Sequence, residues 1–236
     1  MAISMFNKSV FSKKSLGIAL LATGISACGS DNNATEAVLE YEVIVYNDTA
    51  EQPFSPILVA LHNSDISLWS VGSDASSALE NMAEGGSNTE LLALFKGYDV
   101  AVSGSSAIAP GSNELLTISA NQSHATQLSF SSMLVNTNDA FSGLNAVDIS
   151  NLEVGVSMTY NLPVYDAGTE ANSEAAGSIP GPADGGEGYN VVRDDVMNKV
   201  TRHPGLVTQA DDAASVLLPE HRISGNVGRL VITRIN

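Results

Sequence analysis

Residues 38–46 alternate apolar and polar side chains along almost their whole length, and this pattern limits what the segment can form. A period of two is typical of a half-buried β-strand, because successive side chains of an extended chain point to opposite faces. Asn47 and Asp48, two turn-forming residues, follow the run directly. One face of the predicted strand carries Leu39, Tyr41, Val43 and Val45, and the other carries Glu40, Glu42 and Ile44.

Further strand-like runs are separated by clusters of Gly, Asn, Ser and Pro, which are the residues that turns require. Apolar residues at helical spacing indicate two short helices, in residues 75–84 and 89–95. The sequence does not show the regular alternation of strands and helices that is typical of a parallel sheet. The sequence therefore predicts an all-β fold, an antiparallel β-sandwich with one or two short helices. The remaining predicted strands are 99–103, 115–120, 127–135, 152–164 and 229–235.

Residues 167–189 are rich in Gly, Ala, Ser, Glu and Pro and show neither period. We interpret them as a long surface loop within one domain, because a strand pattern returns at the C-terminus. The acidic residues of this loop are expected to form a solvated face; they are Glu170, Glu174, Asp184 and Glu187.

The first 28 residues have the pattern of a secretory signal. They contain no acidic residue, and three lysines precede the apolar run 16–22, which is too short to span a bilayer permanently. The segment ends in Ile25-Ser26-Ala27-Cys28, which resembles the bacterial lipobox, where the signal is cut before a cysteine that then receives lipid. The resemblance predicts a lipoprotein signal peptide over 1–28 and lipidation of Cys28. The polar residues that follow predict a flexible tether over 29–37, and the strand pattern that starts at Val38 predicts a domain over 38–236. A buried structural cysteine is the alternative.

The residue after the cysteine indicates in which membrane a bacterial lipoprotein is held. In Gram-negative lipoproteins an Asp at that place usually means retention at the inner membrane, whereas this chain has Gly29. The resemblance therefore implies an extracytoplasmic protein that is held at the outer membrane if its source is Gram-negative, with the lipid as its only membrane contact.

Charge and cysteine content exclude several classes of function. Ten basic against 26 acidic residues leave a formal charge of −16, which disfavours nucleic acid as a partner and favours cations. One cysteine and four histidines exclude a disulfide framework and a Cys-rich zinc module. No Gly-x-Ser-x-Gly nucleophile motif and no His-Glu-x-x-His zinc motif is present.

Several stretches, in order, resemble the spondin N-terminal domain, the module of F-spondin and mindin that also occurs in bacterial secreted proteins. The most specific pair is Thr-Asn-Asp-x-Phe-x-Gly at 137–143 and Tyr-Asp-Ala-Gly-Thr at 165–169. Together the stretches cover nearly all of the chain after the signal, and the resemblance implies an antiparallel, C2-like β-sandwich. The other stretches are 54–62 with a small apolar strand, Leu68-Trp69, 72–86 with Ala-Glu-Gly-Gly, and 228–235.

The resemblance also implies a calcium site. The aspartates of the two motifs are similar in position to calcium ligands of the family, and carried over they are Asp139 and Asp166, with the carbonyl of Asn136 as a candidate backbone donor. Calcium takes about 6–8 oxygen ligands, which neighbouring loops at one end of a sandwich supply. The alternative is that Asp139 and Asp166 are turn or cap residues that accept backbone N–H bonds.

One family ligand has no counterpart here. The vertebrate pattern adds a glutamate in an earlier strand, where this chain has Ser119 or Ala120. Calcium binding should then be weaker unless another acid substitutes, and the candidates are Glu114, Asp148 and Glu170.

The resemblance implies a non-enzymatic adhesion or interaction module whose partner is an unidentified macromolecule or cell-surface component. A secreted hydrolase is the alternative function. It would use Asp139 and Asp166 as paired carboxylates on a glycan, with the two groups about 5–9.5 Å apart in a cleft. No aromatic platform accompanies the two aspartates, so the sequence favours the interaction module.

Overall fold

The computed structural model describes residues 35–63, 65–97, 99–192 and 199–236. Residues 36–236 form one compact unit. The predicted signal peptide with Cys28, and residues 29–34 of the predicted tether over 29–37, lie outside the described residues.

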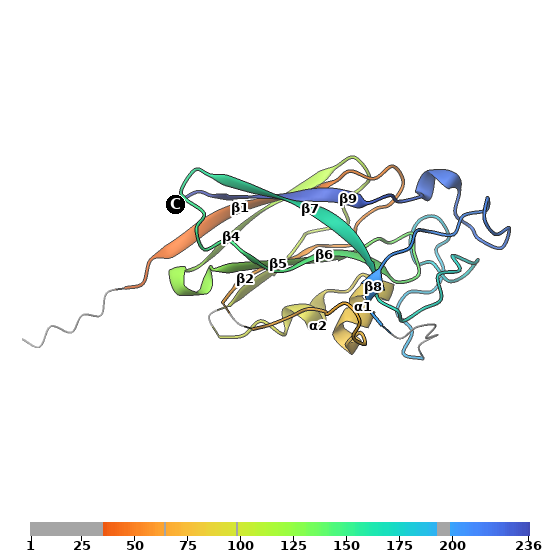
Figure 1. The fold of residues 1–236 in the computed structure, drawn as a ribbon, viewed down its shortest axis with the longest axis horizontal. Coiled ribbons are helices and arrows are strands. Elements are labelled where there is room, and N and C mark those ends of the chain that lie inside the picture. The colour runs from red at the N-terminus through yellow and green to blue at the C-terminus, as the bar shows by residue number, and fades with distance from the viewer. Residues whose placement is uncertain (1–34, 64, 98, 193–198) are drawn as a thin grey trace, which may run out of the picture. The chain divides into compact units, whose positions relative to one another are not determined.

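The described strands pair only antiparallel, and they join in the order β3-β2-β5-β6-β7-β9-β1-β4, with β8 beside β7 (Figure 1). The predicted all-β sandwich is confirmed. The strands are β1 (Val38–Asn47), β2 (Leu58–His62), β3 (Val100–Ser103), β4 (Asn113–Asn121), β5 (Gln127–Met133), β6 (Ala140–Asp148), β7 (Ser157–Asp166), β8 (Thr201–Arg202) and β9 (Asn226–Arg234).

Strand β7 joins the two layers of the sandwich. Its first part, 157–163, pairs with β9, whereas its last residues, 164–166, pair with β6 and β8. A register shift at Leu162 and Pro163 marks the change of partner. Because β7 belongs to both layers, its C-terminal end lies beside the start of β6.

The main core fills the space between the layers. Strand β1 alternates buried and partly exposed residues as its sequence predicted, and Tyr41, Val43 and Val45 face the core. Strand β2 is buried along its whole length, because Val59 and Leu61 face this core while Leu58 and Ala60 face the helices. A strand covered on both faces shows no alternation in sequence.

Helices α1 (Ser77–Gly85) and α2 (Thr89–Leu92) cover the outer face of the β2-β5-β6 layer (Figure 1). The Ser76 hydroxyl caps α1 by accepting the N–H of Leu79 at 3.2 Å, and Gly86 ends the helix in the left-handed conformation. Leu79 and Met82, one turn apart, are fully buried against the sheet. Both predicted helices are therefore present, although α2 is shorter than predicted.

Strand β6 was absent from the sequence prediction. Ala140 faces the main core and Phe141 faces the helix layer, so the first half of the strand, 140–143, is buried on both faces and carries no alternating pattern. Gly143 makes room for the indole of Trp69, since a Cβ at Gly143 would lie 2.2 Å from Cη2 of that ring. The segment 152–156, predicted as the start of a strand, is instead the loop before β7.

Candidate metal centre

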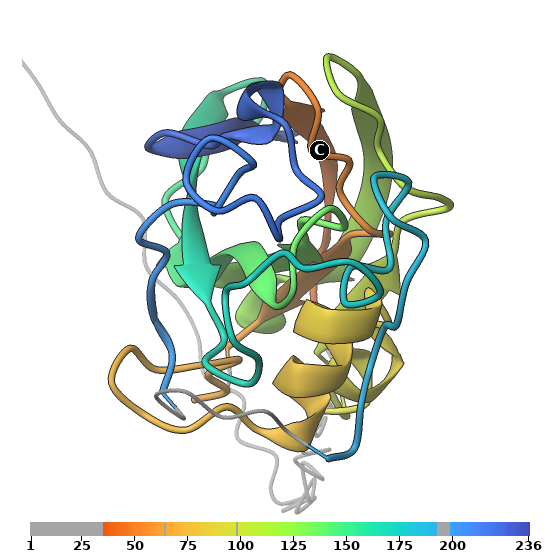
Figure 2. The same ribbon diagram turned by 90° about the vertical axis from the view of Figure 1, so that its right-hand side faces the viewer.

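Asp139 and Asp166 lie together at one end of the domain. Asp139 directly precedes β6, Asp166 is the last residue of β7, and the register places Ala140 opposite Asp166. Both are buried, with exposed fractions of 0% for Asp139 and 6% for Asp166. The loops that follow β7 and β8 surround this end of the strands (Figure 2). Two aspartates 27 positions apart in sequence therefore share one buried apex.

A short turn between β5 and β6 fixes the backbone at Asp139. The Thr137 hydroxyl donates to the carbonyl of Leu134 at 2.6 Å and accepts the N–H of Ala140 at 3.0 Å. The N–H of Leu134 also donates to the carbonyl of Ala140 at 2.9 Å. These bonds close the turn at both ends and hold the Asp139 side chain toward the segment after β7.

Asp139 accepts hydrogen bonds on only one of its carboxylate oxygens. Oδ2 accepts the N–H of Thr169 at 2.8 Å, its hydroxyl at 3.3 Å and the N–H of Glu170 at 3.1 Å. Oδ1 is buried and has no hydrogen-bond partner among the described residues. Burial, together with the charges of Asp166 and Glu84, raises the pKa of Asp139 to about 7, although the two backbone N–H bonds lower it.

Asp166 closes the turn that follows β7. Its Oδ1 accepts the N–H of Gly168 at 2.7 Å, and its Oδ2 accepts a hydrogen bond from the Asn172 side chain. Gly168 has φ +71°, and a Cβ there would lie 2.4 Å from the carbonyl oxygen of Lys199. Both aspartates thus accept backbone N–H bonds, as the turn-and-cap alternative predicts, and this role leaves Oδ1 of Asp139 unused.

Further carboxylates surround the two aspartates. Glu84 comes from α1 and is buried, and Glu170 accepts the Asn138 side-chain N–H at 3.2 Å. Burial, the charge of Glu84 and, more weakly, the charges of Asp139 and Glu187 raise the pKa of Glu170 to about 7, against the Asn138 hydrogen bond. The apex therefore concentrates negative charge in a poorly hydrated place.

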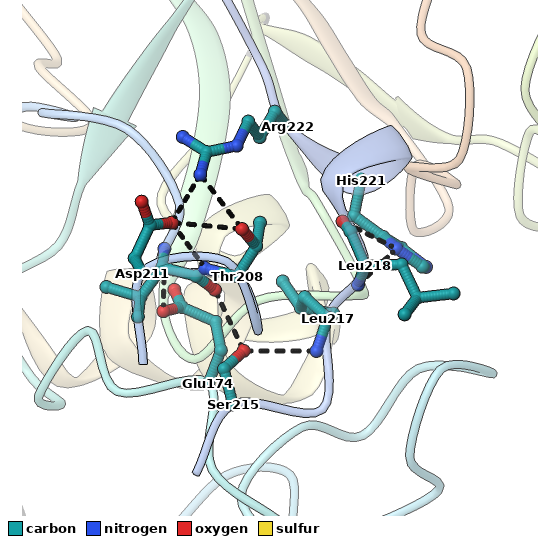
Figure 3. Close-up of polar contacts among 9 residues, drawn as sticks. Glu174, Thr208, Asp211, Ser215, Leu217, Leu218, His221 and Arg222 are labelled. Atoms are coloured by element: carbon teal, nitrogen blue, oxygen red, sulfur yellow. Dashed lines mark hydrogen bonds and ion pairs between the residues drawn. The ribbon is translucent and has the colours of Figure 1, made fainter. Parts of the chain in front are cut away.

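Glu174 belongs to this cluster, contrary to its predicted place on a solvated loop face. It is fully buried, and its Oε2 accepts the N–H of Val207 at 3.1 Å (Figure 3). Burial, together with the charges of Asp139 and Asp166, raises the pKa of Glu174 to about 7, although the Val207 bond lowers it. An antiparallel β-bridge between Ala175 and Ser215 holds the loop that carries Glu174 against the domain. This contact joins segments distant in sequence, and no local sequence pattern indicates it.

Three oxygen atoms in this region are buried without a hydrogen-bond partner among the described residues. They are Oδ1 of Asp139, Oε1 of Glu174 and Oδ1 of Asn172. Each is an acceptor, and buried acceptors are normally paired with a donor, a water or a cation. The apex thus contains buried acceptor oxygens for which the described residues supply no hydrogen-bond donor.

The other predicted ligands lie at different places. Asn136 is buried, but its carbonyl accepts the Gln52 side chain at 3.2 Å and its amide contacts Glu51 and Ala183, so its role as a calcium ligand stays a prediction. Asp148 ends β6, at the far end from Asp139, and Glu114 accepts hydrogen bonds from Ser105. Of the three substitute acids, only Glu170 lies in the cluster.

Within the described residues, no group of three or more His, Cys, Asp or Glu side chains has the arrangement of a formed metal site. Any cation at this apex would therefore take part of its coordination from carbonyl, amide or water oxygens, which calcium accepts readily.

Comparison with known protein families shows to which family the chain belongs. The Spondin_N family matches residues 45–178, more than half of the sequence, and the match includes both aspartate motifs and the cluster from Glu84 to Glu174. The chain belongs to the spondin N-terminal domain family. Spondin N-terminal domains are extracellular modules, and the family is generally non-enzymatic. No curated protein matches the chain significantly.

One further finding concerns membranes. No helix in the part of the chain that the structure describes is long and apolar enough to cross a bilayer.

Proposed function

We propose that this spondin-domain protein is a lipid-anchored, extracytoplasmic interaction module that binds calcium at the Asp139–Asp166 apex. The bound ion would stiffen the loops after β7 and β8, and that end of the domain would then bind another macromolecule or a cell-surface component. The proposal includes no catalytic step.

The observation that carries the calcium proposal is the buried, unpartnered Oδ1 of Asp139 beside the carboxylates of Asp166 and Glu174. Burying several carboxylates together is costly unless protons or a cation compensate their charge. Calcium suits the oxygen atoms present, because it takes carboxylate and amide oxygens in irregular geometry. Glu170 and Glu174 would supply the acidic ligand that the earlier strand lacks.

Calcium should raise the melting temperature of the protein at pH 8. A ligand at about 100 times its Kd adds about 2.7 kcal/mol to the free energy of unfolding, or roughly 5–10 °C for a domain of this size. Asp139→Asn should remove most of the shift, because it replaces an anionic ligand by a neutral one of the same shape. The measurement is thermal unfolding in calcium and in EDTA.

Asp148→Asn is the matched control, since it removes the same charge from the far end of β6, where Asp148 contacts Ser150. This variant should keep the calcium response. Equal melting temperatures of the wild-type protein in calcium and EDTA, or an unchanged response in Asp139→Asn, would refute calcium binding at this apex.

The anchor proposal is supported by the lipobox-like sequence and by the direction of β1. Val38, the first residue of β1, pairs with Asn121 at the end of the domain opposite to Asp139 and Asp166. A tether over 29–37 spans at most about 30 Å when extended. A lipid on Cys28 would therefore hold the β1 end near the membrane and leave the acidic apex facing outward.

Cys28→Ser should move the protein from the membrane fraction to the soluble fraction. The reason is that lipid chains contribute about 0.8 kcal/mol of membrane binding for each buried methylene, and the serine variant lacks the sulfur that would carry them. Fractionation of cells that express the two forms, with immunodetection, measures the effect. Equal distribution of the two forms would refute lipid anchoring through Cys28.

The hydrolase alternative finds no support in the arrangement of the carboxylates. Asp139 is fully buried and Asp166 nearly so, and three of their four oxygens accept hydrogen bonds from the surrounding chain. A glycan substrate does not reach such a pair, whereas a small cation does.

A further inference from the structure

Four large apolar side chains of the described residues are exposed at the β1 end of the domain, opposite to the acidic apex. Val38 begins β1, Val154 and Val156 lie just before β7, and Ile235 follows β9, with exposed fractions of 54%, 57%, 46% and 39%. Because β9 runs antiparallel to both β1 and β7, these strand ends meet at one end of the layer (Figure 1). We call these four residues the apolar pole.

Backbone hydrogen bonds hold the segments of the apolar pole side by side. The N–H of Gly155 donates to the carbonyl of Arg234 at 2.7 Å, which places the 154–156 loop against the end of β9. The N–H of Ile235 donates to the carbonyl of Glu40 at 2.8 Å, which places Ile235 beside the start of β1. The exposed apolar side chains therefore come from three adjacent strand ends.

The fold does not require an apolar residue at Val154. The N–H of Val156 donates to the carbonyl of Glu153 at 3.0 Å and closes a turn with Val154 and Gly155 at its centre. Gly155 has φ +78°, the left-handed conformation that favours glycine at this position of a turn. Surface turns usually carry polar residues or proline at the other central position. Exposed apolar groups gathered at one place indicate a contact surface.

The length of chain between the apolar pole and Cys28 indicates what covers this pole. Ten residue steps separate Cys28 from Val38, so the chain between them reaches at most about 35 Å. A lipid on Cys28 would keep the apolar pole within that distance of the bilayer, at a high effective concentration. Contact with the bilayer would then bury apolar area with little further loss of translational freedom.

The charges beside the apolar pole favour a lipid surface without net charge. The segments that form the pole carry the exposed acids Glu36 and Glu153 and the partly exposed Arg234. They therefore lack the cluster of Lys and Arg that binds anionic lipids. Zwitterionic phospholipids meet the apolar side chains without repelling the two acids.

We infer that the apolar pole rests on the bilayer to which the lipid on Cys28 anchors the protein, with the tip of the 154–156 loop at the level of the upper acyl chains. This contact presupposes the lipid anchor proposed above, and it does not depend on calcium binding. It would hold the domain upright with the acidic apex away from the membrane, whereas the tether alone leaves the orientation of the domain free.

Fluorescence quenching by spin-labelled lipid tests this contact in the lipidated protein. Cys28 is the only cysteine of the chain and its sulfur would carry the lipid, so an introduced cysteine is the only free thiol. Val154→Cys is labelled with a bimane dye and incorporated into phosphatidylcholine vesicles whose lipids carry a nitroxide near the head-group end of one acyl chain. The nitroxide quenches only at short range, so a dye in the upper acyl region should lose about half of its fluorescence or more.

Leu115→Cys, labelled in the same way, is the matched control. Leu115 is 51% exposed, close to the value for Val154, but it pairs with Ile44, six residues along β1 from Val38. This spacing places it about 20 Å along the strand from the apolar pole. The dye at position 115 should therefore keep most of its fluorescence.

A second pair of variants tests whether the apolar side chains make the contact. The dye in Ile235→Cys should also be quenched. Adding Val154→Asp and Val156→Asp should remove about half of that quenching or more, because carboxylates are costly to bring among acyl chains. Unchanged quenching in the variant with both aspartates would overturn the inference.

Flotation with the vesicles separates the membrane contact from the anchor. Protein that floats while its dye at position 154 is quenched no more than the dye at position 115 would overturn the contact and leave the anchor intact. Protein that does not float would refute the lipid anchor and, with it, the contact. Thermal unfolding of each variant shows that it is folded before its fluorescence is compared.

Discussion

Phe141→Ala should lower the free energy of unfolding by about 3–5 kcal/mol, the usual range for removing a buried phenylalanine. Phe141 is fully buried, meets the Trp69 ring edge-on at 5.1 Å between centroids, and stacks on Tyr165 at 5.4 Å. The alanine variant would leave a cavity where β6, β7 and the helix layer meet. Because Phe141 lies two positions after Asp139, the change should also loosen the acidic apex.

Urea unfolding followed by circular dichroism measures this effect. Leu115→Ala is the control, because Leu115 is 51% exposed on β4 and surface changes usually alter stability by less than about 0.5 kcal/mol. If Phe141→Ala were no more destabilising than Leu115→Ala, the packing described for the start of β6 would be wrong.

Without calcium, the protein should become less stable as the pH rises from about 4 to about 7 and should change little above that. Asp139, Glu170 and Glu174 each have a pKa of about 7 in the folded protein, well above their ordinary values of 3.8 and 4.5. In this window the folded state binds protons that the unfolded state has released. Stability therefore falls with rising pH.

Melting temperatures in EDTA between pH 5 and pH 8 measure this dependence, and Asp139→Asn should make it shallower. Asp211 acts in the opposite direction, because its hydrogen bonds to Arg222 and Thr208 lower its pKa to about 2, but its window lies below pH 4. A melting temperature that rises from pH 5 to pH 8 would contradict the description of the acidic apex.

The strands that the sequence predicted well are those with one face in the core. Strand β1 alternates because one face, next to Leu230 and Ile232 of β9, lies in the core while the other is partly exposed, so its pattern of period two is complete. Strand β6 was missed because its first half, 140–143, is covered on both faces, and burial on both faces removes the alternation on which the prediction depends. Only its tertiary neighbours show that it is a strand.

Strand β6, which the sequence pattern does not predict, also explains why the proximity of the two aspartates is not evident from the sequence. Without β6, Asp139 and Asp166 would each follow one of two neighbouring strands, and antiparallel neighbours end at opposite edges of a sheet. In the structure Asp139 directly precedes β6 and Asp166 ends the adjacent antiparallel β7, so their proximity follows directly from the pairing of Ala140 with Asp166. The two motifs were identified from the sequence, and their contact required the strand between them.

Other parts of the apex were not predictable from local pattern. Glu174 lies in a segment of loop composition, and only the bridge of Ala175 to Ser215 and the bond from Val207 bring it inside. Glu84 looks like an ordinary helix residue in sequence, and its burial depends on the loop that packs over α1 and donates the N–H of Asn190 to it. Contacts between segments distant in sequence are not encoded in any short window.

Crystals of the protein grown with and without calcium provide the most direct test of the central claim that this apex holds a cation. The account predicts a calcium difference peak at the apex, about 2.3–2.6 Å from Oδ1 of Asp139 and from oxygens of Asp166 and its acidic neighbours. No peak between these carboxylates at saturating calcium, or a water there at hydrogen-bond distances in both crystals, would contradict it.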